Sequence, residues 1–78
     1  MARLRLFGEA RQRAGTGADH VEGHSVDEVI AAAVLRYGDA FAEVLPVCRI
    51  WVNGEPASGT TPIGEHDEIA VLPPVSGG

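Results

Sequence analysis

The segment that follows Ser25 constrains the fold most, because it reads as an amphipathic helix that must bury one face. Ser25 and Glu28 form a capping box, in which the two side chains satisfy free amide groups at a helix start. Apolar side chains then recur at helical spacing, at Val26, Val29, Ile30, Ala33, Val34 and Tyr37. Gly38 suits the left-handed position just after a helix. The pattern predicts one helix from Val26 to about Arg36.

Short strands on both sides of this helix supply the surface that it needs. Leu4 and Leu6 alternate with Arg3 and Arg5, the period of two that is typical of a half-buried strand. Further strands are predicted over 18–22, 48–52, 55–57 and 68–72. Asn53-Gly54 predicts a tight hairpin turn, and Pro56 confines the return strand to a sheet edge.

The remaining segments read as connections. Residues 8–17 carry three glycines and are strongly polar, which predicts a loop, and 39–46 predict a connection with a short helical turn. The fold class is therefore α+β, a roll in which one main amphipathic helix lies against a mixed sheet. We expect a domain over 1–72 and an extended tail over 73–78.

The small size limits where chemistry can occur. A chain of 78 residues has little room for an enclosed substrate cavity, so chemistry is expected at a surface, a terminus or a subunit interface. Its apolar runs are too short to span a bilayer, and its start does not resemble a signal peptide. Cys48 is the single cysteine, which leaves no internal disulfide. We expect a soluble, cytoplasmic protein without a membrane partner.

The charge is acidic and uneven. Six arginines against eleven acids give a net charge of −5, which argues against a nucleic-acid partner and favours one with a basic docking site. Residues 1–13 hold four arginines and one acid, a sum of +3, and the remainder holds two arginines and ten acids, a sum of −8. Lysine is absent from the sequence. Any amide bond to a lysine side chain must therefore be made on another protein.

Conventional catalytic and metal sites find little support. His20, His24 and His66 lack metal-ligand spacing, and we predict no metal site. Cys48 lies on the inward face of a predicted strand, where a thiol is usually an inert core group. The acid pair Asp67-Glu68 merely opens a strand.

The end of the sequence is more informative. Pro73 and Pro74 stiffen the exit from the last strand, and Gly77-Gly78 lack side chains, which lets the backbone enter a narrow channel. Six extended residues reach roughly 20 Å. The segment Pro73, Pro74, Val75, Ser76 and Gly77 is thus suited to insert the Gly78 carboxylate into another protein's active site.

A second feature is the outward side of the sheet. Strand alternation places Phe7, Trp51 and Leu72 outward, and the first and last strands of such a roll lie side by side. An exposed apolar patch near the root of the tail is typical of an interface. We expect Phe7, Arg11, Trp51 and Leu72 to contact a partner.

These features resemble the small subunit of molybdopterin synthase, a ubiquitin-like sulfur carrier of the β-grasp fold. The resemblance covers essentially the whole chain. It rests on Leu6-Phe7 with Ala10-Arg11 and Ala14-Gly15, on Val52-Asn53-Gly54, on Gly64 with Asp67-Glu68, and on the ending Leu72-Pro73-Pro74-Val75-Ser76-Gly77-Gly78.

The resemblance implies a role in molybdenum cofactor biosynthesis. A ubiquitin-activating-type adenylyltransferase would use ATP and Mg to adenylate the Gly78 carboxylate, and a sulfurtransferase or cysteine desulfurase would supply the sulfur of a thiocarboxylate. The tail would enter the synthase large subunit, in a heterotetramer of two small and two large subunits, and pass sulfur to cyclic pyranopterin monophosphate. The chain would bind no cofactor and would not be catalytic alone.

Three alternatives remain open from the sequence. The chain is a sulfur carrier for thiamin or cysteine synthesis, a protein modifier joined through Gly78 to lysines of other proteins, or an interaction module that never uses its terminus. The Gly-Gly ending counts against the last of these.

Overall fold

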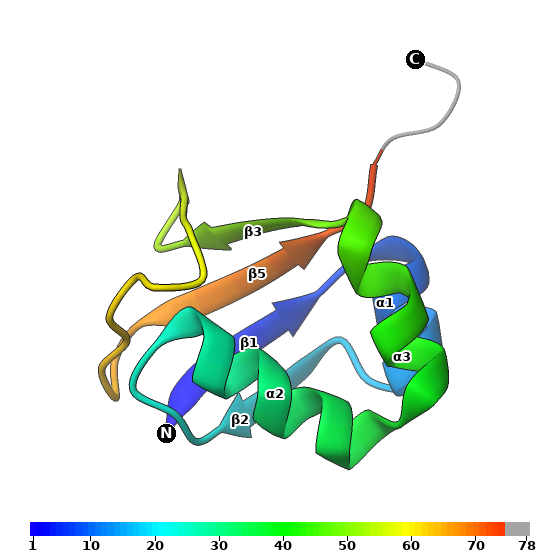
Figure 1. The fold of residues 1–78 in the computed structure, drawn as a ribbon, viewed down its shortest axis with the longest axis horizontal. Helices are drawn as coiled ribbons and strands as arrows, with labels where there is room; N and C mark the ends of the chain where they lie inside the picture. The colour runs from blue at the N-terminus through cyan, green and yellow to red at the C-terminus, as the bar shows by residue number, and fades with distance from the viewer. Residues whose placement is uncertain (75–78) are drawn as a thin grey trace.

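A mixed five-stranded sheet forms the centre of the molecule in the computed structural model, which describes residues 1–74 (Figure 1). Strand β1 (Ala2–Leu6) lies parallel to β5 (Glu68–Leu72), and β2 (Ala18–Val21) pairs antiparallel with the other side of β1. Strand β3 (Arg49–Val52) pairs antiparallel with β5, and β4 (Glu55–Pro56) forms the edge. The order β2-β1-β5-β3-β4 confirms the predicted α+β roll with a mixed sheet.

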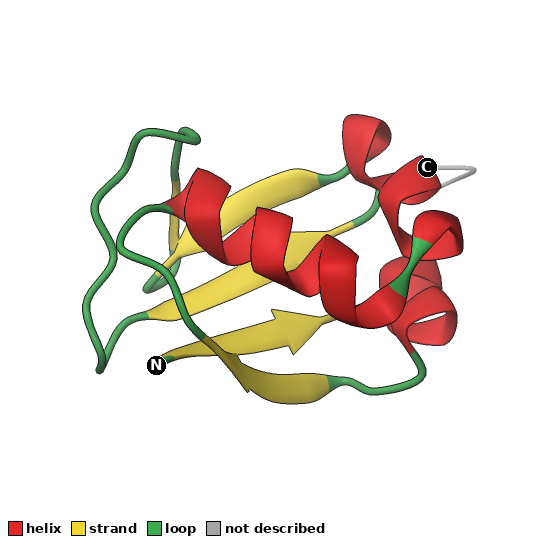
Figure 2. Cartoon of the chain, turned by 60° about the horizontal axis from the view of Figure 1, so that its bottom comes forward, coloured by secondary structure: helices red, strands yellow, loops and turns green. Residues whose placement is uncertain are grey.

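Helix α2 (Val26–Tyr37) is the predicted amphipathic helix, and it lies across one face of the sheet (Figure 2). The Ser25 hydroxyl accepts a hydrogen bond from the Glu28 amide at 3.2 Å, and the Glu28 carboxylate accepts one from the His24 amide at 3.0 Å. This is the predicted capping box, with the carboxylate reaching back one residue further. Gly38 follows the helix with a φ of 95° and a ψ of −172°, a conformation that favours glycine but lies outside the predicted left-handed helical region.

The predicted loop over 8–17 is wrong, because Gly8–Ala14 form helix α1. Ala10 is fully buried, and Ala14, one turn later, packs against the core. Gly15 ends the helix with a φ of 81° and donates its amide hydrogen bond to the Arg11 carbonyl. The glycines therefore mark the two ends of a short helix, which tertiary burial of its alanine face stabilises.

The connection after α2 also holds more helix than predicted. Helix α3 (Asp39–Val44) and the 3₁₀ turn η1 (Leu45–Val47) lead to β3. Phe41 anchors α3, since it is fully buried and contacts Tyr37 edge-to-face with 5.2 Å between ring centroids. The expectation of one main helix is thus corrected to three α-helices within residues 1–74. Helices α1 and α3 group at one end of the sheet (Figure 2).

The core lies between α2 and the inner face of the sheet, and among residues 1–74 no polar side chain is fully buried. Its members are Ala2, Leu4, Leu6, Ala10, Val21, Val26, Val29, Ala33, Phe41, Val44, Ile63, Ile69 and Val71. The turn at Asn53-Gly54 takes the predicted left-handed conformation, with φ of 51° and 84°. Within residues 1–74, the helices are all too short or too polar to cross a membrane.

Candidate functional site

The described chain leaves the sheet beside helix α1. Strand β5 ends at Leu72, and the half-buried Pro73 packs against the start of α1. Gly8 lies next to it, and its φ of +55° favours glycine, whereas a methyl group there would sit at an ordinary contact distance of 3.4 Å from Pro73 Cγ. The point at which the tail begins is therefore held in place by a contact between segments far apart in the sequence. Figure 1 shows β5 ending next to α1 and α3.

Most residues of the tail lie outside the part of the chain that the structure describes. Pro74 is exposed, and Val75, Ser76, Gly77 and Gly78 lie beyond the described residues. The predicted extended conformation of 73–78 and the domain boundary after residue 72 therefore stay predictions.

An apolar hollow of about 460 Å³ borders the root of the tail. Its lining includes Phe7, Val44, Val47, Leu72 and Pro73. Phe7 is 39% exposed and Val47 is 60% exposed, which is unusual for side chains of this kind. The structure thus brings together two of the predicted contact residues, Phe7 and Leu72, next to the place where the tail begins.

Trp51 belongs to the same face of the sheet but lies further from the tail. It pairs with Ala70 on β5, whereas Arg49, two residues earlier, pairs with Leu72. Trp51 is half-buried and lines a separate hollow with Pro56 and Ala57. The apolar surface therefore has a main part at Phe7 and Leu72 and an extension at Trp51.

Arginines surround the apolar surface formed by Phe7, Leu72 and Trp51. Strand alternation predicted the positions of some of these arginines but not of all. Arg3 and Arg5 point outward from β1 as predicted, and Arg49 does so from β3. The Arg5 guanidinium lies 5.5 Å from the centre of the Phe7 ring, a cation–π distance. Arg11 is exposed on α1, in a segment predicted to be a loop, so its position relative to β1 was not foreseeable from strand alternation.

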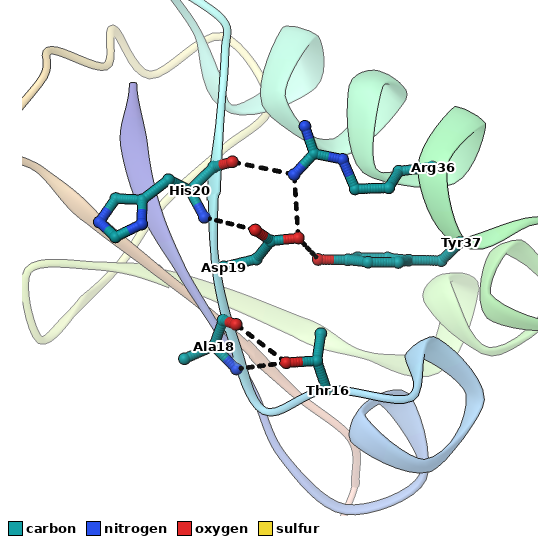
Figure 3. Close-up of polar contacts among 6 residues, drawn as sticks. All are labelled: Thr16, Ala18, Asp19, His20, Arg36 and Tyr37. Carbon is teal, nitrogen blue, oxygen red and sulfur yellow. Dashed lines mark hydrogen bonds and ion pairs between the residues drawn. The ribbon is translucent and has the colours of Figure 1, made fainter.

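A polar network at the β2 edge has a structural role (Figure 3). The Asp19 carboxylate accepts hydrogen bonds from the Tyr37 hydroxyl at 2.6 Å and from the Arg36 guanidinium at 2.9 Å. The Tyr37 hydrogen bond, followed by that of Arg36, lowers the pKa of Asp19. Burial, and then the same carboxylate, raise the pKa of Tyr37 to about 12. The network ties β2 to the last turn of α2, far from the root of the tail.

Cys48 and Asp67 have structural surroundings as well. Cys48 packs against the core, its Sγ donates to the Val44 carbonyl at 3.2 Å, and burial raises its pKa. A thiol of this kind is a poor nucleophile. Asp67 accepts hydrogen bonds from the Asn53 side chain at 3.0 Å and the Gly64 amide at 2.8 Å, which lower its pKa. These bonds join the hairpin to the loop before β5.

The arrangement is that of a small β-grasp domain, and comparison with known proteins agrees. The Methanosarcina acetivorans small archaeal modifier protein 1 is 27% identical, with a TM-score of 0.89 and coverage of 99% of this chain and 95% of that one. The Pyrococcus furiosus protein assigned as molybdopterin converting factor subunit 1 is 26% identical (TM-score 0.83, coverage 95% and 97%).

A third similar structure comes from a complex. A chain in the complex of subunits 1 and 2 of the molybdopterin-converting factor from Helicobacter pylori is 28% identical, with a TM-score of 0.72 and coverage of 99% of this chain and 97% of that one. A search of curated protein sequences found no match.

The fold defines the class: this is a ubiquitin-like protein with a β-grasp domain. Residues 4–78 match the model of the ThiS family. The chain therefore belongs to the ThiS family of ubiquitin-like sulfur carriers.

Proposed function

We propose that this chain is the sulfur-donating small subunit of a molybdopterin synthase. The observation that carries the proposal is the ending Leu72-Pro73-Pro74-Val75-Ser76-Gly77-Gly78, which begins beside an exposed apolar surface. Similarity to molybdopterin converting factor subunits from two organisms, at 26% and 28% identity, is consistent with this pathway.

The chemistry takes place at the Gly78 carboxylate in this proposal. A carboxylate is a poor electrophile, so an activating enzyme joins it to AMP from ATP and releases pyrophosphate. The terminal sulfur of a persulfide then attacks the acyl carbon and AMP leaves, and a second thiol cleaves the resulting acyl disulfide by exchange, which releases the thiocarboxylate. Magnesium and ATP belong to the activating enzyme, and the chain binds neither. The thiocarboxylate sulfur is a soft nucleophile, and its transfer to cyclic pyranopterin monophosphate occurs in the large subunit.

Docking and delivery are divided between two parts of the chain. Phe7, Leu72 and Trp51 provide the apolar contact surface, with Arg11 beside it. Pro73 and Pro74 lead away from that surface, and six extended residues reach roughly 20 Å. A partner bound at the face thus receives Gly78 in its active site. The partners are the adenylyltransferase, the sulfurtransferase or cysteine desulfurase, and the large subunit, with two copies of each synthase subunit.

Reconstitution tests the pathway. The thiocarboxylated protein is mixed with the large subunit from the same organism and with cyclic pyranopterin monophosphate, and molybdopterin is measured by fluorescence after oxidation. Formation of molybdopterin is expected. A silent mixture, together with sulfur transfer to the thiazole- or cysteine-forming enzymes, would instead assign the chain to thiamin or cysteine synthesis.

A protein modifier is the second candidate, and the 27% identity to the small archaeal modifier protein 1 favours it. In that case an acceptor lysine would attack the activated Gly78. Affinity purification of the tagged chain from its own cells, under denaturing conditions, distinguishes the two. Adducts that join Gly78 to lysines of other proteins support the modifier, and their absence supports the carrier.

The length of the tail provides the sharpest test of Gly78. Adding one residue after Gly78, or deleting Gly78, moves the terminal carboxylate by roughly 3.5 Å. A displacement of even 1 Å can cost about 100-fold in rate. We expect both variants to fold normally and to gain no sulfur, measured by intact-protein mass spectrometry after incubation with the activating enzyme, ATP and a sulfur donor. Near-normal sulfur transfer in the variant lacking Gly78 would mean that the terminus is not the reactive group.

A further inference from the structure

We propose that the outer face of the sheet binds an acidic surface of the partner enzyme, and that Arg11, which lies against Gly17, is its main electrostatic contact. The inference rests on the proposed function in that the partner is the enzyme that activates the tail. It reverses the expectation from net charge, which predicted a basic docking site.

Positive charge is concentrated on the outer face of the sheet, although Glu9 borders the hollow at the root of the tail. The outer positions of β1, β5 and β3 carry three arginines and one acid, and α1 adds Arg11, so that this face sums to +3. The rest of the chain holds two arginines and ten acids and sums to −8. Complementary potential across an interface steers association and fixes orientation. An acidic surface therefore fits this face, although the whole protein is an anion.

The arginines on the two sides also differ in their partners. Arg13 is bound by Glu9 at 3.0 Å and Glu43 at 3.4 Å, and Arg36 is bound by Asp19. By contrast, no carboxylate among residues 1–74 forms an ion pair with Arg3, Arg11 or Arg49. Arg5 has only a long contact to Glu68, at 3.8 Å. The cations of the outer face thus remain available to a partner's carboxylates.

Gly17 positions Arg11. A methyl group on Gly17 would lie 3.0 Å from Nε and 3.2 Å from Cζ of Arg11, so the guanidinium rests directly on the glycine. Gly17 is not among the glycines with positive φ, so its backbone conformation does not require a glycine. The missing side chain is instead explained by the space that Arg11 occupies.

The position of these residues joins the charged and apolar parts into one surface. Arg3, Arg5, Arg11 and Gly17 line a shallow hollow of about 540 Å³. Arg5 also lies over the Phe7 ring, which borders the root of the tail. The partner is therefore expected to present Asp or Glu side chains beside an apolar centre. Bidentate arginine–carboxylate pairs suit such a surface.

Binding measurements with matched variants test the proposal. The probe is the purified activating enzyme from the same organism, titrated by calorimetry with wild type, Arg11→Gln and Arg13→Gln. The two arginines lie on one helix, two residues apart, but Arg13 is already paired. We expect Arg11→Gln to weaken binding about tenfold and Arg13→Gln to leave it unchanged. Equal affinity of Arg11→Gln and wild type, with both folded, overturns the proposal.

Gly17→Ala separates position from charge. It retains every arginine but requires the Arg11 side chain to shift by a few tenths of an ångström, and its backbone conformation is tolerated. For Gly17→Ala we expect weaker binding with unchanged thermal stability. For Arg11→Gln we expect the affinity to depend less on NaCl concentration than it does in wild type. Wild-type affinity that does not change with salt contradicts an acidic partner surface. Binding of the wild type to single-stranded RNA, without binding to the enzyme, also contradicts an acidic protein surface as the partner.

A variant that lacks Gly78 distinguishes this inference from the proposed function. It retains the outer face, so its binding to the activating enzyme should still depend on Arg11, and yet it should gain no sulfur. If it still gains sulfur, the proposed function fails and the docking face is unaffected. If Arg11→Gln binds normally and wild type gains sulfur, the docking inference fails alone.

Discussion

The two faces of the sheet use the same strands for different purposes. On the inner face, Leu4, Leu6, Ile69 and Val71 are fully or almost fully buried under α2 and α3. On the outer face, the residues that alternate with them are arginines, Glu68 and partly exposed apolar side chains, none of them fully buried. The period of two along a strand makes this possible, because each residue faces opposite to its neighbours.

The difference teaches where stability and recognition are encoded. Inner-face side chains are removed from water by the chain itself, so their substitution should change the free energy of unfolding. Outer-face side chains are to be covered by a partner, so their substitution should change the free energy of binding. Three tests follow from this contrast, beginning with the largest expected effect.

Phe41→Ala tests the inner side. Phe41 is fully buried in α3, and removal of such a ring typically costs about 3–5 kcal/mol of stability. Leu35→Ala is the matched control, since Leu35 is 88% exposed on α2 and should change stability by less than about 0.5 kcal/mol. Urea unfolding followed by circular dichroism measures both.

If Phe41→Ala does not fold at all, Phe41→Leu keeps the test quantitative, with an expected cost of about 1–2 kcal/mol. A loss at Leu35 as large as that at Phe41 would contradict the assignment of the inner face as the main source of stability.

Phe7→Ala and Leu72→Ala test the outer side. Truncation of an apolar anchor in an interface typically costs about 2 kcal/mol of binding. We expect this loss for both the activating enzyme and the large subunit, with the unfolding transition shifted much less than in Phe41→Ala. Calorimetric titration with each partner gives the affinities. Unchanged affinities in folded variants would remove Phe7 and Leu72 from the docking surface.

Tyr37→Phe is the smallest test, and it concerns the network that joins β2 to α2. It removes the hydrogen bond to Asp19, which is worth about 1 kcal/mol. The pKa of Asp19 is lowered in the folded state, so this contribution is present above the unfolded value of about 4 and is lost as pH falls through the folded pKa. The tyrosine donor itself stays protonated until pH approaches its own pKa of about 12.

Unfolding of wild type and Tyr37→Phe at a series of pH values from 7 to 2 measures this. The difference in stability should be largest near pH 7 and should shrink in acid. Binding to the activating enzyme should not change, because the network lies away from the root of the tail. A constant difference over the whole pH range would mean that the Asp19 carboxylate is not the acceptor that matters.

Strong local patterns predicted most of the sheet and the main helix. Alternation of Leu4 and Leu6 with arginines, the Ser25 capping box and the Asn53-Gly54 turn each involve neighbours in sequence, and all three are confirmed. Helix α1 was missed because seven residues that begin with glycine have little helical tendency alone. The sequence signals for this helix were Ala10 and Ala14, which lie one turn apart, and Gly15 at its end. They were overlooked because the segment is otherwise strongly polar.

The sequence by itself determined the strands, the main helix and the ending that carries Gly78, because periodicity, capping and turn chemistry are local. Only the tertiary structure decided what those pieces form together. Parallel pairing of β1 with β5 puts Phe7 beside Leu72, and Pro73 packs next to Gly8 at the start of α1. Packing of α1 on the core brings Arg11 to Gly17 and next to the arginines of β1. These contacts depend on packing between distant segments, which no local pattern records.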